Sequence, residues 1–517
     1  MKQKTWIISA LMYAMVIMAC LGVLHLLKEM TENNAPSGTV AEESTDHTEP
    51  EIDFAEEEET KEDIAETGSE EEESDVPVER EEGYYGWKQE LPQIFPSVPE
   101  EVPYEPPRLI LATDLHYQSA QADDGGAAFQ LFVERGDGKV VEYLPELLEA
   151  FMDQVIEEHP SALVLSGDIT MNGEKINHEE LARGLMRVQD AGIPVLIVPG
   201  NHDINNPHAA VYFGEEKAET DPVTPEEFYN IYHMYGYDQA ISRDDASLSY
   251  VYQLDERNRL LMLDTCQYEP KNMVEGQLKV ETLRWADEQL KKAKEDGMNV
   301  LPIGHHNLLA QSRMYTTQCA MNNNGDVIEL FQKYELPLYL SGHLHVQRIR
   351  KHKAEPGAAD DSYGIMEIVT DALSIPPCQY ALLEWKRDGS MEYSTKAVDV
   401  SAWAARTGSQ NPDLLDFEGW SERYIQKLII DQIRGVVKNL GNDVEHSMAE
   451  VYASVYIDYY AGRRIDAKGI RSSKGYRWWE RNMPDSYLLK ELDAMIDDSD
   501  RDNNYMLLPE VNAAAEE

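Results

Sequence analysis

The sequence predicts an α/β protein that is preceded by a long N-terminal extension and followed by a small helical unit. Two patterns support this prediction. Short apolar runs typical of buried strands alternate with amphipathic helical patterns through the middle of the chain. Further on, strand patterns follow one another directly, and the C-terminal part shows helical spacing alone. At 517 residues the chain is also too long for one ordinary hydrophobic core.

The predicted strands are short, and most are followed by polar residues. In the alternating region they cover Arg108–Thr113, Ala162–Ser166, Pro194–Pro199, Leu260–Leu263, Val300–Ile303 and Pro337–Leu340. Helices with apolar residues at i, i+3 and i+4 are predicted at Leu144–Glu158, His178–Ala191 and Val280–Lys294. Three further strands, without helices between them, are predicted at Tyr363–Val369, Tyr380–Trp385 and Met391–Val398. We therefore expect one α/β domain over residues 108–400.

The C-terminal part predicts a separate helical unit at residues 401–496. Two long amphipathic helices are expected at Leu414–Lys438 and Asp443–Tyr460, broken at Gly441-Asn442. A shorter helix is expected near Ser486–Ile496. The remaining residues, 497–517, are expected to form a loose tail.

The first 28 residues predict an uncleaved membrane anchor. Lys2 and Lys4 precede an apolar run from Trp6 to Leu27, and Lys28 ends it. These 22 residues would span about 33 Å as a helix, enough for a hydrocarbon core of about 30 Å. The two N-terminal lysines place the later residues outside the cytoplasm, in a single-pass cell-membrane protein. A cleaved signal peptide remains an alternative, as does a lipoprotein lipidated at Cys20.

An acidic stretch dominates the predicted tether at residues 29–82. From Glu42 to Glu82 the chain has 21 acidic and two basic residues, so this stretch carries −19 of the formal net charge of −51. Such a segment is too polar and too self-repelling to form a core, which predicts a disordered tether. A Pro- and aromatic-rich lead-in follows at residues 83–107. Since the chain has no basic patch, sequence-specific binding of nucleic acid is not expected.

Five clusters of metal-type residues follow predicted strands, where α/β proteins collect functional groups. They are Asp114-Leu115-His116, Gly167-Asp168, Gly200-Asn201-His202-Asp203, Gly304-His305-His306 and Gly342-His343-Leu344-His345. Each cluster alone is a weak signal, but all five in this order are hard to explain by chance. Carboxylate, imidazole and amide oxygen suit Mn, Fe, Zn or Co, and the lack of thiolates argues against a structural zinc site. Two neighbouring ions need a shared carboxylate, for which Asp168 is the obvious candidate.

These clusters resemble the calcineurin-like metallophosphoesterase family over about residues 108–400. The resemblance implies a sandwich of two mixed β-sheets flanked by helices, and an enzyme that hydrolyses phosphomonoesters or phosphodiesters through a hydroxide bridging two divalent metal ions. It also implies ligand sets for both ions. One ion would be held by Asp114, His116, Asp168 and His345, and the other by Asp168, Asn201, His305 and His343. The family's catalytic histidine matches His202, with Asp203 orienting it.

Several questions stay open at the level of sequence. His306 is adjacent to His305 and is the alternative ligand, although the family usually uses the first histidine of such a pair. The substrate, a small or polymeric phosphate ester, is not identified by the motifs, and neither is the oligomeric state. A membrane-tethered binding protein that keeps the fold but has little activity is the alternative function.

Two further stretches each have two interpretations. The polar segment 117–139 is either a substrate-facing loop or a plain surface loop. The aromatic residues of the helical unit line a nucleobase or glycan pocket, or they pack in its core. They are Tyr452, Tyr456, Tyr459, Tyr460, Trp478 and Trp479.

Overall fold

The computed structural model describes residues 104–315, 317–352 and 364–508. The predicted anchor, the predicted tether and all but the end of the lead-in lie outside the described residues. Within the described part of the chain, no helix combines the length and the apolar character needed to cross a membrane. The membrane anchor therefore stays a prediction.

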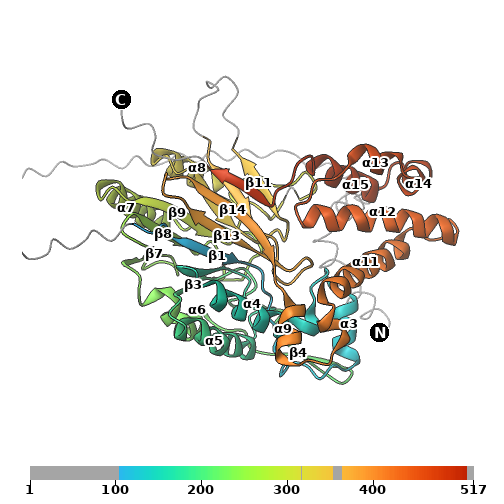
Figure 1. Ribbon diagram of the computed structural model, residues 1–517, viewed down its shortest axis with the longest axis horizontal. Coiled ribbons are helices and arrows are strands. Elements are labelled where there is room, and N and C mark those ends of the chain that lie inside the picture. The colour runs from blue at the N-terminus through green and yellow to red at the C-terminus, as the bar shows by residue number, and fades with distance from the viewer. Residues whose placement is uncertain (1–103, 316, 353–363, 509–517) are drawn as a thin grey trace, which may run out of the picture. The chain divides into compact units, whose positions relative to one another are not determined.

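A six-stranded mixed sheet carries the first three metal-type clusters (Figure 1). Its strands are β1 (Arg108–Ala112), β2 (Ala162–Ser166), β3 (Val195–Val198), β13 (Gln379–Trp385), β14 (Met391–Ala397) and β15 (Tyr505–Leu508). Their order in the sheet is β15-β14-β13-β1-β2-β3. Strands β1, β2 and β3 are parallel, whereas β13, β14 and β15 are joined by antiparallel pairing. The carboxyl ends of β1, β2 and β3 thus meet at one edge.

A seven-stranded mixed sheet carries the other two clusters. Its strands are β6 (Ser242–Arg243), β7 (Tyr250–Gln253), β8 (Asn258–Leu263), β9 (Asn299–Gly304), β10 (Leu338–Ser341), β11 (Arg348–Lys351) and β12 (Met366–Val369). Their order is β11-β12-β10-β9-β8-β7-β6, with β8, β9, β10 and β12 parallel. A separate hairpin consists of β4 (Ala210–Phe213) and β5 (Glu216–Glu219).

The two large sheets pack face to face, and helices cover their outer faces. Strand β8 shows how the alternation of side chains builds these layers. Leu260 and Met262 join the core between the sheets. Leu261 and Leu263 point the other way, into the core under α7 (Val280–Glu295) and α8 (Asn324–Lys333). The prediction of an α/β protein with two large mixed sheets and flanking helices is therefore confirmed.

The remaining helices of the α/β part precede these two in the chain. They are α3 (Ala127–Glu134), α4 (Leu144–Glu158), α5 (Lys175–Asp190) and α6 (Pro225–Tyr232). The apolar residues of α4 and α5 pack in the same core as β1, β2 and β3. Their positions agree with the helices predicted from i, i+3, i+4 spacing.

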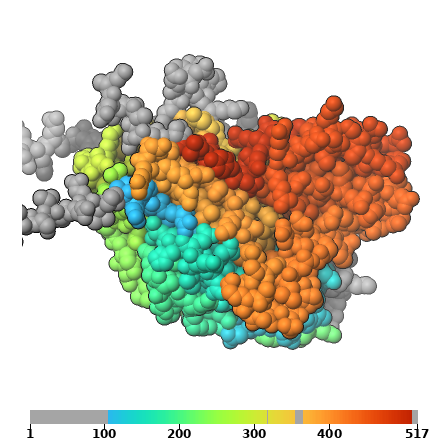
Figure 2. Space-filling model, viewed as in Figure 1, coloured from blue at the N-terminus to red at the C-terminus, as the bar shows by residue number. Residues whose placement is uncertain are grey.

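Seven helices follow β14 among the described residues, and most share a second core, which Leu344, Val346 and Val369 of the α/β part join. They are α9 (Val400–Thr407), α10 (Pro412–Leu415), α11 (Phe417–Val436), α12 (Asn442–Tyr460), α13 (Ala467–Ser472), α14 (Lys474–Asn482) and α15 (Tyr487–Asp498). The three predicted C-terminal helices correspond to α11, α12 and α15. Gly441 separates the first two with a φ of +96°, a conformation that residues with a Cβ rarely adopt. In the space-filling view these helices pack directly on the α/β part (Figure 2).

The expectation of a loose tail from residue 497 needs correction. Helix α15 continues to Asp498, and Tyr505–Leu508 forms β15, which pairs antiparallel with β14. The sequence gives little indication of this strand, because four residues after an acidic turn are too few to show an alternation of apolar and polar side chains. Its pairing partner lies more than a hundred residues earlier in the chain.

A buried carboxylate joins the loop that follows β9 to the end of β10. Glu367 on β12 accepts hydrogen bonds from the backbone N–H groups of Leu308 and Leu309, at 2.8 and 2.6 Å, and from the side chains of Gln311 and Ser341. Burial raises the pKa of Glu367 to about 7. All four partners donate, so the ionised carboxylate fits this position best.

We predict that Glu367→Gln destabilises the fold by about 1–3 kcal/mol at pH 8, where the native carboxylate is ionised. The NH₂ group of the new amide would face hydrogen-bond donors and cannot accept from them, so at least one donor would be left unsatisfied. Chemical denaturation measures the loss. Glu392→Gln on β14 is the matched control, because this half-buried carboxylate forms a solvent-accessible ion pair with Lys386, and it should shift the midpoint little. Equal midpoints for both variants would contradict the role given to Glu367.

Candidate metal centre

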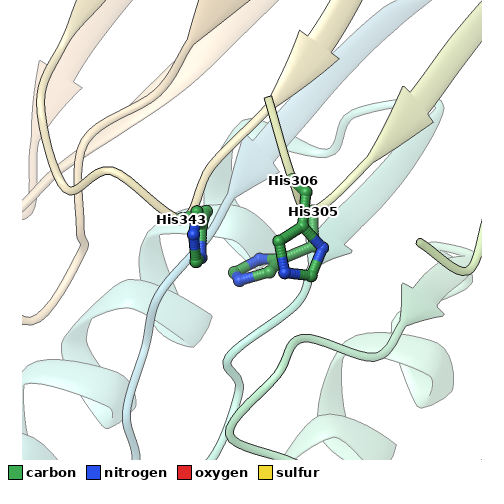
Figure 3. Close-up of side chains that lie close together, drawn as sticks. All are labelled: His305, His306 and His343. Atoms are coloured by element: carbon green, nitrogen blue, oxygen red, sulfur yellow. The ribbon is translucent and has the colours of Figure 1, made fainter. Parts of the chain in front are cut away.

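The described structure brings all five predicted clusters to one place. Asp114 and His116 follow β1, Asp168 follows β2, and Asn201 follows β3 at the neighbouring strand ends of the six-stranded sheet. The histidine pairs follow β9 and β10, which are adjacent and parallel in the other sheet. Figure 3 shows His305, His306 and His343 converging from these two strand ends.

The first group consists of Asp114, His116, Asp168 and His345, whose ligand atoms all lie within 4.8 Å of one another. The Nε2 atoms of His116 and His345 are 3.0 Å apart, and His345 Nε2 lies 3.1 Å from Asp114 Oδ1. This is the complete set predicted for the first ion.

The chemistry of this group fits a divalent cation. Asp114 Oδ1 is buried, and among the described residues its contact with His345 Nε2, at 3.1 Å, is an ion-pair distance without hydrogen-bond geometry. Two imidazole nitrogens facing each other at 3.0 Å need a positive charge or a shared proton between them. Ligand nitrogens about 2.0–2.1 Å from one ion and roughly at right angles would be separated by this distance. A metal ion between these atoms would satisfy the aspartate oxygen and the two facing ring nitrogens.

Asp168 connects this group to a second one, which consists of the other predicted ligands, Asn201, His305 and His343. Its Oδ2 lies 4.0 Å from His116 Nε2 and 3.3 Å from His305 Nε2. His305 Nε2 is also 3.3 Å from Asn201 Oδ1. Burial opposes ionisation of Asp168, but the surrounding histidines prevail and hold its pKa well below the usual range. The carboxylate thus stays charged between the two groups, as expected for a bridging ligand.

His305 and His306 both lie close to His343, yet their hydrogen bonds distinguish them. His305 Nδ1 donates to the Ser166 carbonyl oxygen at 3.0 Å, which leaves Nε2 directed at Asp168. His306 has partners for both nitrogens: Thr265 Oγ1 at 2.8 Å and the Val274 carbonyl oxygen at 3.0 Å. Although His306 belongs to a geometric cluster with His305 and His343, it has no lone pair left for a metal. The hydrogen bonds favour His305 as the ligand.

The backbone at this site is strained in a consistent way. Five of the seven predicted ligands adopt positive φ values between 44° and 70°: Asp114, His116, Asp168, His343 and His345. Such residues cost about 1–3 kcal/mol each and cluster at functional sites. Gly200 is required for a different reason, because a Cβ there would lie 2.1 Å from the Asp168 backbone nitrogen. The fold thus accepts strain to direct these side chains at common points.

His202 lies beside the ligand groups rather than within them. Its Nδ1 lies 2.7 Å from the Met171 carbonyl oxygen, to which it donates, and its Nε2 lies 3.9 Å from Asp168 Oδ2. About a third of the side chain is exposed, at 33%. The ring therefore presents Nε2 to a ligand that approaches from solvent, consistent with the predicted catalytic role.

The expected role of Asp203 needs correction. Its buried carboxylate accepts hydrogen bonds from the backbone nitrogens of Gly200, Ile169 and Thr170, at 2.8, 3.2 and 2.9 Å, and from the Thr170 hydroxyl. It therefore ties the turn after β3 to the turn after β2, whereas Met171 orients His202. Adjacency in sequence suggested a direct contact, but successive side chains in a tight turn point in different directions. Asp203 is a positioning residue.

Sequence reasoning missed the residues that support the ligands. Thr113 donates to Asp114 Oδ2 at 2.7 Å, and Asn172 Oδ1 lies 3.1 Å from His202 Nδ1. Thr113 could have been found from its place beside Asp114. Asn172 belongs to no recognisable motif and is brought in only by the turn after β2.

The site has the residues of a metal-dependent hydrolase, and comparison with known proteins gives two family-model matches. Residues 107–347 match the model of the calcineurin-like phosphoesterases, and residues 399–502 match the C-terminal domain of cyclic nucleotide phosphodiesterase. The chain thus contains a calcineurin-like phosphoesterase domain and is a metal-dependent hydrolase of phosphoric esters. Its Asp and His cluster fits a binuclear divalent metal centre.

The comparison with solved structures gives matches at low identity. A dimetal phosphatase from Danio rerio is 16% identical, with a TM-score of 0.42 over 57% of this chain and 97% of its own. A purple acid phosphatase from yellow lupin (Lupinus luteus) seeds is 13% identical, with a TM-score of 0.38 over 57% of this chain and 52% of its own. The comparison with curated proteins gave no match.

Two substitutions should separate ligand from catalyst. Asp168→Ala removes the carboxylate shared by both groups, so we expect the protein to lose bound metal as well as activity. His202→Ala should keep two ions per chain but lose about 10²–10⁴-fold in turnover. Metal analysis of the purified variants, alongside kinetics, provides the measurement. Loss of an ion from His202→Ala, or two tightly bound ions in Asp168→Ala, would contradict these assignments.

Proposed function

We propose that this chain is a membrane-tethered phosphodiesterase that acts outside the cytoplasm on nucleoside cyclic phosphates. The observation that carries the catalytic part is the position of Asp168 between two ligand groups, with His202 Nε2 beside it. The match of residues 399–502 to the C-terminal domain of cyclic nucleotide phosphodiesterase supports the substrate class.

The candidate ligands have distinct tasks in this proposal. One divalent ion would be held by Asp114, His116 and His345. The other would be held by Asn201, His305 and His343. Asp168 would bind both ions. When bound, the two ions supply a hydroxide nucleophile at neutral pH and positive charge for the phosphoryl oxygens. The protein's part is to fix these groups rigidly before the substrate arrives.

His202 would act on the substrate itself. Its Nδ1 proton is engaged by the Met171 carbonyl oxygen, so Nε2 is the free position of the neutral ring. A protonated Nε2 would donate to a phosphoryl oxygen or to the departing alkoxide oxygen. In a cyclic diester the departing oxygen stays attached to the sugar, so a single proton transfer completes ring opening.

The location rests on the N-terminal sequence. The apolar run Trp6–Leu27 is long enough to cross a membrane, and Lys2 and Lys4 favour a cytoplasmic N-terminus. The acidic stretch that follows would hold the enzyme away from anionic lipid headgroups. Protease treatment of intact cells tests this location. If the catalytic domain lies outside the cytoplasm, a protease added to the medium should cleave it.

A binding protein that keeps the fold without turnover is disfavoured by the structure. All seven predicted ligands lie close together, and five of them keep a strained backbone. Strain of this kind persists where function requires the geometry.

A substrate panel tests the proposed activity on the purified, Mn²⁺-reconstituted chain. We expect hydrolysis of bis-p-nitrophenyl phosphate and of 3′,5′- or 2′,3′-cyclic nucleotides, and little hydrolysis of p-nitrophenyl phosphate, because the proposal specifies a diester. Asp168→Ala, prepared in parallel, controls for contaminating enzymes. A marked preference for the monoester would contradict the proposed substrate class, and no hydrolysis of any ester would favour the binding protein.

A further inference from the structure

His343 and His345 each direct one ring nitrogen at the ligand groups and the other at a supporting loop. His343 Nε2 donates to the Gln318 carbonyl oxygen at 2.8 Å, which leaves Nδ1 as its free nitrogen. His345 Nε2 faces Asp114, and its Nδ1 lies 3.8 Å from Asp137 Oδ2, at ion-pair distance. Such outer partners fix the tautomer and orientation of a ligand histidine.

The partner of His343 belongs to a loop that rests on the C-terminal helices. We name residues 311–315 and 317–319 the His343 loop. Its Ser312 accepts a hydrogen bond from Tyr459 of α12 at 2.6 Å, and its Tyr315 hydroxyl contacts that of Tyr460. Its Arg313 backbone nitrogen donates to Asp498 of α15 at 2.9 Å.

The partner of His345 belongs to a second loop that rests on the same helical unit. We name residues 135–140 the His345 loop. Tyr424 of α11 donates to the Lys139 carbonyl oxygen at 3.0 Å, and Gln432 donates to that of Gly136 at 3.2 Å. Gly138 lies so close to Ile425 that an added Cβ would be 2.3 Å from its Cδ1. Within the loop, Lys139 pairs with Asp137.

These contacts also answer the question posed by the aromatic residues. Tyr452, Tyr459, Tyr460 and Trp479 are buried in the core of the helical unit, which excludes an open pocket lined by them. The hydroxyls of Tyr459 and Tyr460, at the end of α12, are both directed at the His343 loop.

We propose that the helical unit, residues 400–498, is a positioning element of the metal centre. It holds Gln318 and Asp137, the outer partners of His343 and His345, through two loops that are far apart in the sequence. The histidines of one Gly-His-Leu-His motif thus depend on the same helical unit for their orientation. This inference rests on the proposed metal ligands and explains why the phosphoesterase domain carries this extension.

The test compares tyrosine hydroxyls of the helical unit that contact the two loops with one that contacts only the helical unit itself. The double variant Tyr424→Phe/Tyr460→Phe removes one contact to each loop. Tyr476→Phe is the matched control, because this hydroxyl donates to Asp493 within the helical unit at 2.6 Å. Asp137→Asn changes the partner of His345 directly. Mn²⁺ affinity of the metal-free full chain is measured by calorimetry, the Co²⁺ form by absorption spectroscopy, and stability by thermal unfolding.

We expect the double variant and Asp137→Asn each to bind Mn²⁺ about 10-fold more weakly or worse, with an altered Co²⁺ spectrum. Tyr476→Phe should keep the wild-type affinity and spectrum even if it unfolds at a lower temperature. Unchanged affinity and spectrum in the double variant would overturn the proposal, and so would an equal loss in Tyr476→Phe. A wild-type chain that binds fewer than two ions would instead overturn the metal assignment itself, and this inference with it.

Discussion

The burial of two carboxylates beside a set of imidazoles is the constraint on which the structure depends. Asp114 and Asp168 are almost completely inaccessible, at 0% and 1% exposure, and charges are costly to bury without compensation. Nearby histidine protons offset part of this cost, but within the described part of the chain Asp114 Oδ1 has only the ion-pair contact with His345 Nε2 and no well-aligned hydrogen bond. Divalent cations would balance these charges, so the arrangement makes physical sense as a metal centre and little sense as a packed core.

The rest of the fold serves to hold these groups in place. Two mixed sheets bring parallel strand ends together from both sides, and each ligand lies in a turn directly after its strand. Left-handed backbone at five ligands requires support from outside the turns. Asp203 ties the turns after β2 and β3, and Glu367 ties the loop after β9 to the end of β10. The helical unit extends the same support to His343 and His345.

Much of this could be predicted from the sequence, because each ligand cluster is contiguous with an apolar strand and the helices have clear periodicity. The site residues that could not be predicted act across long distances. Asp137 and Gln318 meet their histidines only through tertiary packing, and neither lies in a motif. The same limit explains β15, whose four residues gain their structure from pairing with β14. Asp203 adjoins His202 in sequence but does not contact its ring, because successive side chains in the turn point in different directions.

Anomalous scattering from crystals grown with Mn²⁺ tests the central claim most directly. The account predicts two peaks about 3.5–4 Å apart with the Asp168 carboxylate between them. One peak should contact Nε2 of His116 and of His345, and the other Nε2 of His305 and Oδ1 of Asn201. A single peak, or a peak bound by His306 in place of His305, would contradict it.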